Sequence, residues 1–512
     1  MKTKFIFFIF CAILFGCTNN QRLEEENGME TGSILSHKEI NDLIKKRIKE
    51  TGQFAWNKES VDVVWSALVC GDSILSVGYG SSPVEDGHNL RAVNRDELYQ
   101  LLEIAPDKAY DPIKLKSQSM RVGFIDEDTV LNVVDIKVAS KEKLAELLAD
   151  KRLRYIEPTG YRFFSEDELI GQENENKSSS DPGNSSGCGY SDDKIAEADY
   201  ILVAPGAKVP WNFYIHRIPE AWKFSTGAGI TLAIVDTGIS PEQELLNKSF
   251  NEGYSQGRYI EKHGVYVNSW LPSSSTNYDG VDDKCGHGTK MASAATAPRN
   301  DHHLPVGIAY NANLVMYRAV KNVVIDGYNE QNGVARALKE LADNKDVKII
   351  SMSLGHIMKL NKVADAIKYA YSKGKIIFAA GGTSTSWTSW AGVIFPANMK
   401  ETFAVTGVKE GEEIRCDICH SGSLIDFTVT MERKGSKNNV PVLSYYNNKA
   451  SYVGGSSVAT ASMAGITALV WARHPEWTRE QVINKLIESS QYSKNRSNQF
   501  GYGNVDVLKA VQ

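Results

Sequence analysis

The sequence has no excess of positive charge. Its 57 Lys and Arg residues are outnumbered by 62 Asp and Glu residues, and the formal net charge is -5. Proteins that bind nucleic acids normally carry a basic domain or stripe, so no nucleic-acid partner is expected. With 42% hydrophobic and 23% charged residues, the composition is that of an ordinary globular protein. The 512 residues exceed what one hydrophobic core usually serves, so we expect two or more domains.

The apolar run at the N-terminus is too short to span a membrane. Lys2 and Lys4 flank the start of FIFFIFCAILF, which leads to LFGC ending at Cys17, a pattern typical of a secretory signal. The cleavage context resembles a bacterial lipobox and predicts a signal peptide over residues 1–16 with lipidation of Cys17. A plain cleaved signal and an uncleaved anchor are the alternatives. The expected location is the bacterial cell envelope, with the exported protein anchored to a lipid membrane through Cys17.

Cysteine is scarce. Of the seven cysteines, Cys11 and Cys17 belong to the predicted signal, which leaves an odd number in the rest of the chain. At least one of these is then unpaired or pairs between chains. Export permits disulfides but does not prove them. The remaining cysteines are Cys70, Cys188, Cys285, Cys416 and Cys419.

The chain after the signal divides into four regions. Residues 17–50 begin with TNNQRLEEENGMETGS, which is polar and without periodicity, and predict a tether. Residues 51–165 predict a small α+β domain. Residues 166–205 begin with a stretch rich in Ser, Asn, Glu and Gly and predict a linker or processing segment. Residues 206–512 predict the largest domain.

The small α+β domain shows a strand, helix, strand pattern. The β-branched run VLNVVDIKV gives way to a helix that begins near Ser140, a suitable N-cap residue. Leu144, Leu147 and Leu148 fall on one face of this helix, and the short strand RLRYIE follows.

In the largest domain, short apolar runs alternate with the amphipathic helical patterns NGVARALKELADN and KVADAIKYAYSKG. Apolar strands separated by helices predict an α/β fold, with a mainly parallel sheet covered by helices on both faces. Catalytic groups are then expected at the carboxyl ends of the strands. The expected strands are ITLAIV, NLVMYRAV, VKIISMSL, KIIFAA and TFAVTGV.

Three positions suit nucleophilic catalysis. Asp236 ends the run LAIVD, where its carboxylate can partner an imidazole. His287 lies between Gly286 and Gly288, which let the backbone pack closely and leave the ring free to be aimed. GGSSVATASMAG opens a long helix of small and apolar residues, so a serine at its start lies at the positive end of the helix dipole.

These three blocks, in the order Asp, His, Ser, resemble those of the subtilisin-like serine proteases, or subtilases. The resemblance covers roughly Val209 to Gln512 and is carried by AIVDTGI, GHGTKMA and GSSVATASMAG. It assigns the nucleophile to Ser457, with Ser456 in the position of the family threonine and Ser462 inside the helix. An α/β-hydrolase requires its acid and histidine after the serine, which is the reverse order.

The resemblance implies a serine endopeptidase, made as an exported proenzyme, that hydrolyses polypeptides through an acyl-enzyme. The segment IISMSLG resembles the family strand that pairs with the substrate backbone, which assigns substrate binding to Ser353, Leu354 and Gly355. Residues 51–165 are similar to the inhibitory propeptides of subtilases, which also act as folding chaperones. A stand-alone interaction domain is the alternative for this region.

The sequence departs from the family pattern at the oxyanion position. Where the family has an asparagine that donates to the oxyanion, FAAGGTST places Gly382. The backbone N–H of Ser457 would remain as a donor, and Thr383 or Ser384 would be a substitute if the loop is turned differently. A catalytically impaired subtilase-fold lipoprotein that only binds peptides is therefore the alternative function.

Two patterns raise the question of metals and cofactors. CDICH, residues 416–420, matches the covalent haem signature. Zinc binding by Cys416, Cys419, His420 and Cys285 is conceivable by ligand type. A disulfide or buried thiols fit this segment better. The chemistry requires no cofactor. Family members often bind structural calcium through surface loops, and APRNDHHLP lies near one such loop, but its ligands cannot be assigned from the sequence.

Overall fold

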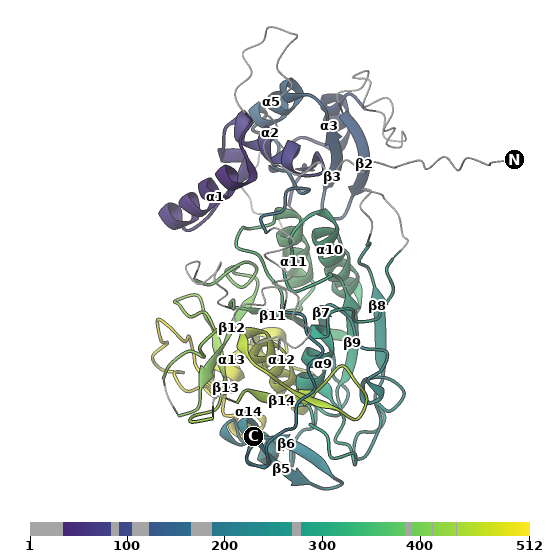
Figure 1. Ribbon diagram of the computed structural model, residues 1–512, viewed down its shortest axis with the longest axis vertical. Helices are drawn as coiled ribbons and strands as arrows, with labels where there is room; N and C mark the ends of the chain where they lie inside the picture. The colour runs from purple at the N-terminus through teal and green to yellow at the C-terminus, as the bar shows by residue number, and fades with distance from the viewer. Residues whose placement is uncertain are drawn as a thin grey trace, which may run out of the picture.

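The computed structural model describes residues 34–82, 92–104, 122–164, 187–268, 278–383, 392–411, 413–436 and 438–512. The predicted signal peptide 1–16, the lipidation site Cys17 and residues 166–186 of the predicted linker lie outside the described residues. The remainder forms an N-terminal domain stacked on a larger C-terminal domain (Figure 1).

The N-terminal domain is α+β, with an antiparallel sheet in the order β2-β3-β1-β4. The predicted strand, helix, strand unit is confirmed as β3, α5 and β4, and the Ser140 side chain caps α5 by accepting from the backbone N–H of Lys143 at 3.2 Å. The strands are β1 Ile74–Gly78, β2 Val122–Asp128, β3 Val133–Val138 and β4 Tyr155–Glu157. The helices are α1 His37–Thr51, α2 Val61–Cys70, α3 Arg95–Leu102, α5 Lys141–Ala149 and the short 3-10 helix η1 Trp56–Lys58.

The predicted tether 17–50 is wrong for its second half, because residues 37–51 form helix α1. Ser36 and Glu39 make a capping box at its start, and Ile40, Ile44 and Ile48 are buried. This i, i+4 spacing places the three isoleucines on one face of a helix. The spacing is visible in the sequence and could have predicted the helix.

The predicted linker 166–205 is also wrong for its second half. Cys188 forms a disulfide with Cys285 of the C-terminal domain. Strand β5, Tyr200–Val203, pairs antiparallel with β6, Ala207–Pro210. Residues 187–205 therefore belong to the larger domain.

The C-terminal domain is α/β, as predicted. Its sheet has seven parallel strands in the order β13-β12-β11-β10-β7-β9-β8. Along β7, Leu232 and Ile234 join the core cluster that contains residues of α9 and α12, whereas Ala233 and Val235 join the cluster that contains residues of α10 and α11. Helices thus cover both faces. The strands are β7 Thr231–Asp236, β8 Ile260–Gly264, β9 Asn313–Arg318, β10 Val347–Met352, β11 Ile376–Ala380, β12 Phe403–Lys409 and β13 Phe427–Glu432, and the helices are α9 His287–Thr296, α10 Tyr328–Asp343, α11 Asn361–Ser372 and α12 Gly455–Arg473.

Helix α12 is the core helix of this domain. An 18-residue stretch of this helix has a mean hydropathy of 1.2, which would suit a membrane span by length and composition. However, 89% of that stretch is buried inside the protein. The N-terminal domain rests on α10 and α11, on the opposite side of the sheet from α12 (Figure 1). The smaller elements are α7 Trp211–Ile215, α8 Ile218–Ala221, α13 Arg479–Glu488, α14 Val507–Val511, β14 Val440–Leu443, β15 Ala450–Val453 and the 3-10 helices η2 Glu197–Asp199 and η3 Glu244–Leu246.

Candidate active site

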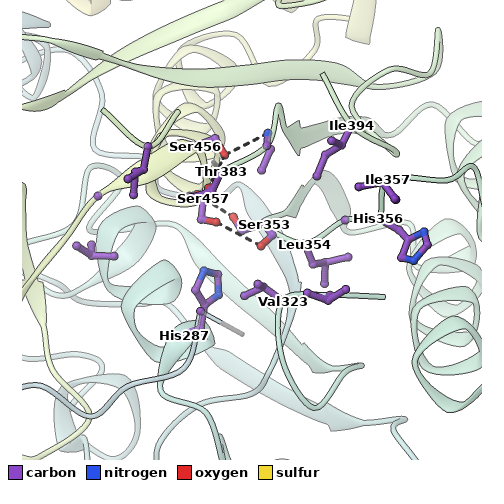
Figure 2. Close-up of a pocket in the computed structure, with 18 of the residues that line it drawn as sticks. His287, Val323, Ser353, Leu354, His356, Ile357, Thr383, Ile394, Ser456 and Ser457 are labelled. Carbon is purple, nitrogen blue, oxygen red and sulfur yellow. Dashed lines mark hydrogen bonds between the residues drawn. The ribbon is translucent and has the colours of Figure 1, made fainter. Parts of the chain in front are cut away.

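The predicted site residues meet at one edge of the parallel sheet. Strands β7, β10 and β11 are neighbours, and their carboxyl ends carry Asp236, residues 353–355 and Gly382. Helix α9 begins at His287 and α12 begins at Gly455, both facing the same edge. A single pocket is lined by His287, Ser353, Leu354, Gly355, Gly382, Thr383, Ser456 and Ser457, among others (Figure 2).

Asp236 and His287 form a buried pair. The imidazole Nδ1 lies 2.8 Å from Asp236 Oδ1 and 3.0 Å from Oδ2, and the residues are 1% and 3% exposed. An ionised carboxylate only accepts hydrogen bonds, so Nδ1 carries the proton and donates it. This fixes the tautomer and leaves the lone pair of Nε2 available as a base.

Asp283 is a buried carboxylate that sequence reasoning missed. It accepts hydrogen bonds from the backbone N–H groups of Cys285, Gly286 and Thr289, and from the hydroxyls of Thr237 and Thr289, at 2.6–3.0 Å. The turn that leads into His287 is therefore tied to the residue that follows Asp236. An acidic residue a few positions before a helix start is a capping signal that could have identified it.

Ser457 is the third residue of α12, next to the buried Ser456. Its Oγ donates to the backbone oxygen of Ser353 at 3.5 Å, and the Ser353 hydroxyl donates back to Ser457 O at 2.8 Å (Figure 2). Among the described residues, no hydrogen bond joins Ser457 Oγ to His287. The serine and the imidazole line one pocket, but the hydroxyl and the ring are not in hydrogen-bond contact through which a proton could pass.

The segment 353–355 lines the pocket, but its last residue is already paired within the chain. The N–H of Gly355 donates to Val323 O at 3.0 Å, and Gly355 O accepts from the N–H of Ile325 at 3.0 Å. Both backbone groups of Gly355 are therefore paired within the chain. The predicted role of residues 353–355 in substrate binding stays a prediction.

Gly382 lies over the CDICH segment. Its φ is +123°, and an added Cβ would lie 2.4 Å from Nδ1 of His420. That nitrogen hydrogen-bonds to Gly392 O at 2.5 Å, and burial lowers the pKa of His420, which favours the neutral ring. Cys416 and Cys419 form a disulfide, so their sulfur atoms are not thiolate ligands here, and the segment supports the Gly382 turn.

Two parts of the chain, one just before the predicted linker 166–205 and one inside it, reach the same pocket. Phe164 lines it from the N-terminal domain, and Gly187 lines it from the other side. A Cβ on Gly187 would lie 3.4 Å from His287 Cδ2. The disulfide between Cys188 and Cys285 anchors this second segment two residues before the histidine. The pairing of these cysteines could not be predicted from the sequence.

The segment APRNDHHLP contributes Asp301 and His302 to a small cluster with Glu252. Glu252, Asp301 and His302 place one ligand atom each within 4.8 Å of the others. All three are partly or fully exposed, and exposed acidic groups commonly gather without an ion, so this cluster alone does not identify a metal site.

Comparison with known proteins identifies the family to which the chain belongs. The Peptidase_S8 model, described as the subtilase family, matches residues 227–503. Subtilisin E of Bacillus subtilis (strain 168) is 28% identical over 319 residues, which are 62% of this chain and 74% of that protein. Subtilisin BL of Lederbergia lenta is 28% identical over 306 residues, which are 59% of this chain and 99% of that protein.

Among solved structures, the MycP3 protease from the type VII (ESX-3) secretion system is 23% identical, with a TM-score of 0.45 over 61% of this chain and 91% of that one. The family match covers more than half of the chain and includes the Asp236, His287 and Ser457 blocks. The chain therefore belongs to the subtilase family of serine peptidases.

Proposed function

We propose that this protein is a serine endopeptidase with Asp236, His287 and Ser457 as its catalytic triad. His287 Nε2 takes the proton of Ser457 Oγ as the oxygen bonds to the peptide carbonyl carbon. The tetrahedral intermediate collapses, the C–N bond breaks, and the same proton passes to the leaving amine. Water then attacks the acyl-enzyme, with His287 again as the base, and releases the second product.

The observation that carries this proposal is the buried Asp236–His287 pair, whose ring lines the same pocket as Ser457. Such a carboxylate both orients the imidazole and stabilises its charged form. Catalytic hydrogen bonds are often long in free enzymes and tighten in the substrate complex, which accommodates the open Ser457–His287 distance.

The test is labelling with a fluorophosphonate probe, which reacts covalently with activated serines. Protein without residues 1–16 is compared with its Ser457→Ala and Ser456→Ala variants. Label that is lost in Ser457→Ala and kept in Ser456→Ala supports the proposal. Folded wild-type protein that takes no label, also after cleavage within 166–186, would instead support the peptide-binding alternative, which the glycine at position 382 favours.

We also propose that the N-terminal domain is an inhibitory propeptide. It contacts α11 through buried charges: Arg154 Nη1 lies 2.5 Å from Asp365 Oδ2, and Lys362 Nζ lies 2.5 Å from Asp135 Oδ2. Glu157 accepts from the backbone N–H of Asn361, the first residue of α11, at 3.0 Å. A side-chain acceptor at this position caps the first turn of the helix.

The tail of this domain leads into the pocket. The Asp326 carboxylate accepts from the backbone N–H groups of Phe163 and Phe164 at 2.9 and 2.8 Å, and Phe164 lines the pocket. Residues 166–186 follow directly, so cleavage there would free the tail while residues 187–205 stay with the catalytic domain. Inhibition of the cleaved catalytic domain by added N-terminal domain tests this role.

Export and membrane attachment through Cys17 are part of the same proposal and rest on residues 1–17. Incorporation of labelled fatty acid, lost in Cys17→Ser, would test the anchor. The proposed reaction requires no cofactor, and a structural calcium site stays a prediction without assigned ligands.

A further inference from the structure

The proposed reaction places negative charge on the former carbonyl oxygen, and such an oxyanion needs donors that are already in position. The first N–H groups of α12 have no partners within that helix, and the helix dipole is positive there. Ser457 N–H is therefore one donor. A single donor is a weak oxyanion site, so the question is which other group in the pocket wall can supply a second.

Position 382 cannot supply a side-chain donor. Its φ of +123° is rarely adopted by residues with a side chain, and His420 Nδ1 and Cε1 would lie 2.4 and 3.0 Å from a Cβ. His420 is held in place by two hydrogen bonds. Its backbone N–H donates to Gly382 O at 3.0 Å, and its ring Nδ1 hydrogen-bonds to Gly392 O. The glycine is thus required by the packing, and the donor must come from a neighbour.

Thr383 is that neighbour. It lines the pocket together with His287 and Ser457, and its Oγ1 lies 3.2 Å from Ser456 Oγ, at the start of α12 (Figure 2). Its backbone forms a bridge with Cys419, whose disulfide to Cys416 stiffens the adjoining segment. We propose that the Thr383 hydroxyl is the second oxyanion donor, an assignment that rests on the serine peptidase function proposed above.

Ser456 supports this role through its own hydrogen bonds. Its Oγ accepts from the backbone N–H of Gly382 at 3.3 Å and is fully buried. Ser456 can therefore give its own proton to Thr383 Oγ1, and the Thr383 proton can turn toward an oxyanion when one forms, because a hydroxyl rotates about its C–O bond. In this arrangement Ser456 is a positioning residue and Thr383 is a catalytic one.

The rate of fluorophosphonate labelling tests the assignment, since the phosphonyl oxygen develops charge in the same site. Thr383→Val keeps the shape and removes the hydroxyl, and Thr383→Ser keeps the hydroxyl. Loss of one oxyanion donor costs about 10²–10³ in rate, a figure measured in this same family. We expect a loss of about that size in Thr383→Val and a rate within about threefold of wild type in Thr383→Ser, since a good donor remains.

Thermal unfolding of each variant controls for misfolding, and Thr383→Ala is the second choice if Thr383→Val unfolds early. A Thr383→Val rate within threefold of wild type, with label still lost in Ser457→Ala, would overturn the Thr383 assignment and leave the peptidase proposal standing. Wild-type protein that takes no label, or takes it equally in Ser457→Ala, would overturn both. A clearly larger loss in Ser456→Ala than in Thr383→Val would show that Ser456 does more than position Thr383 and would overturn the assignment.

Discussion

The two halves of the proposed catalytic centre are assembled to different degrees. On the acid–base side, Asp236 and His287 are in hydrogen-bond contact at 2.8 Å and almost fully buried. On the nucleophile side, Ser457 Oγ donates to Ser353 O at 3.5 Å, and Gly382 stands where the family has an asparagine. Buried contacts of the fold position the side chains of the first half, whereas the geometry of the second half depends on the loops around Ser457.

The difference has a structural cause. Asp236 ends a strand in the middle of the sheet, and Asp283 fixes the turn that presents His287, so both side chains are placed by buried contacts. The nucleophile side is bordered by Gly187, Val323 and Val324, which lie on loops and line the pocket. We therefore expect changes of Asp236 or His287 to affect mainly the chemical step, and changes on the nucleophile side to affect the assembly of the site as well.

Removing the nucleophile or the base should give the largest effect. We expect Ser457→Ala and His287→Ala each to lower kcat by a factor on the order of 10⁶, as in this family, and the double variant to be no worse, because the two residues act as one unit. Hydrolysis of a fluorogenic peptide measures this. Ser462→Ala, inside α12, is the control that should keep activity. Additive losses would mean that the two halves work independently.

Asp236→Asn should cost less, about 10⁴ in kcat, because the amide no longer holds the imidazole in the productive tautomer. The matched control is Asp283→Asn. Since Asp283 accepts from three backbone N–H groups, we expect that variant to lower the unfolding temperature as its first effect. Kinetics and thermal unfolding of both variants, measured side by side, separate orientation of the base from stability. An Asp236→Asn enzyme with near-normal kcat would contradict the proposed triad.

The positions on the acid–base side could be predicted from the sequence. Asp236 ends the buried strand β7, and His287 begins helix α9 and contacts Asp236. Their catalytic roles stay predictions. The α/β fold followed from the same apolar strands. A tether was predicted where helix α1 lies, because the stretch before the helix is polar and without periodicity. The spacing of Ile40, Ile44 and Ile48 nevertheless marks the buried face of the helix.

The nucleophile side was harder to predict, because its features come from contacts between distant segments. Nothing in FAAGG indicates that His420 fills the space above Gly382, and nothing in SLG indicates that Gly355 pairs with Val323. The disulfide between Cys188 and Cys285 joins residues 97 positions apart, and an odd cysteine count allowed many pairings.

Alanine at position 382 should destabilise the protein. The positive φ costs about 1–3 kcal/mol for a residue with a side chain, and the clash with His420 adds about 1–3 kcal/mol. Gly374→Ala is the matched control, since that glycine has a φ of +83° and open space around its Cβ position. Denaturant unfolding should show a greater loss of stability for Gly382→Ala. Equal losses would mean that His420 moves aside and that position 382 can accept a side chain.

The smallest predicted effect concerns the docking of the N-terminal domain. Burial raises the pKa of Glu157 to about 7, against the opposing hydrogen bonds from Asn361 and the charge of Lys359, while Asp365 adds to the rise. Because the pKa is higher in the docked state, docking is favoured at low pH, and this contribution is lost as the pH rises through about 7. After cleavage within residues 166–186, the dissociation constant should rise about 10- to 100-fold from pH 5 to pH 8.

Glu157→Gln should flatten this pH dependence, because a neutral amide still accepts from the Asn361 N–H and has no proton to lose. Asp128→Asn is the control at the same interface: it removes the 2.5 Å ion pair with Lys339 on α10 and should weaken docking without changing its pH profile. If Glu157→Gln keeps the full pH dependence, another group at the interface is responsible. Asp126 is then the next to vary, because burial raises its pKa and its carboxylate lies 3.6 Å from Arg336 on α10. Such a result would move the pH sensor from the start of α11 to the surface of α10.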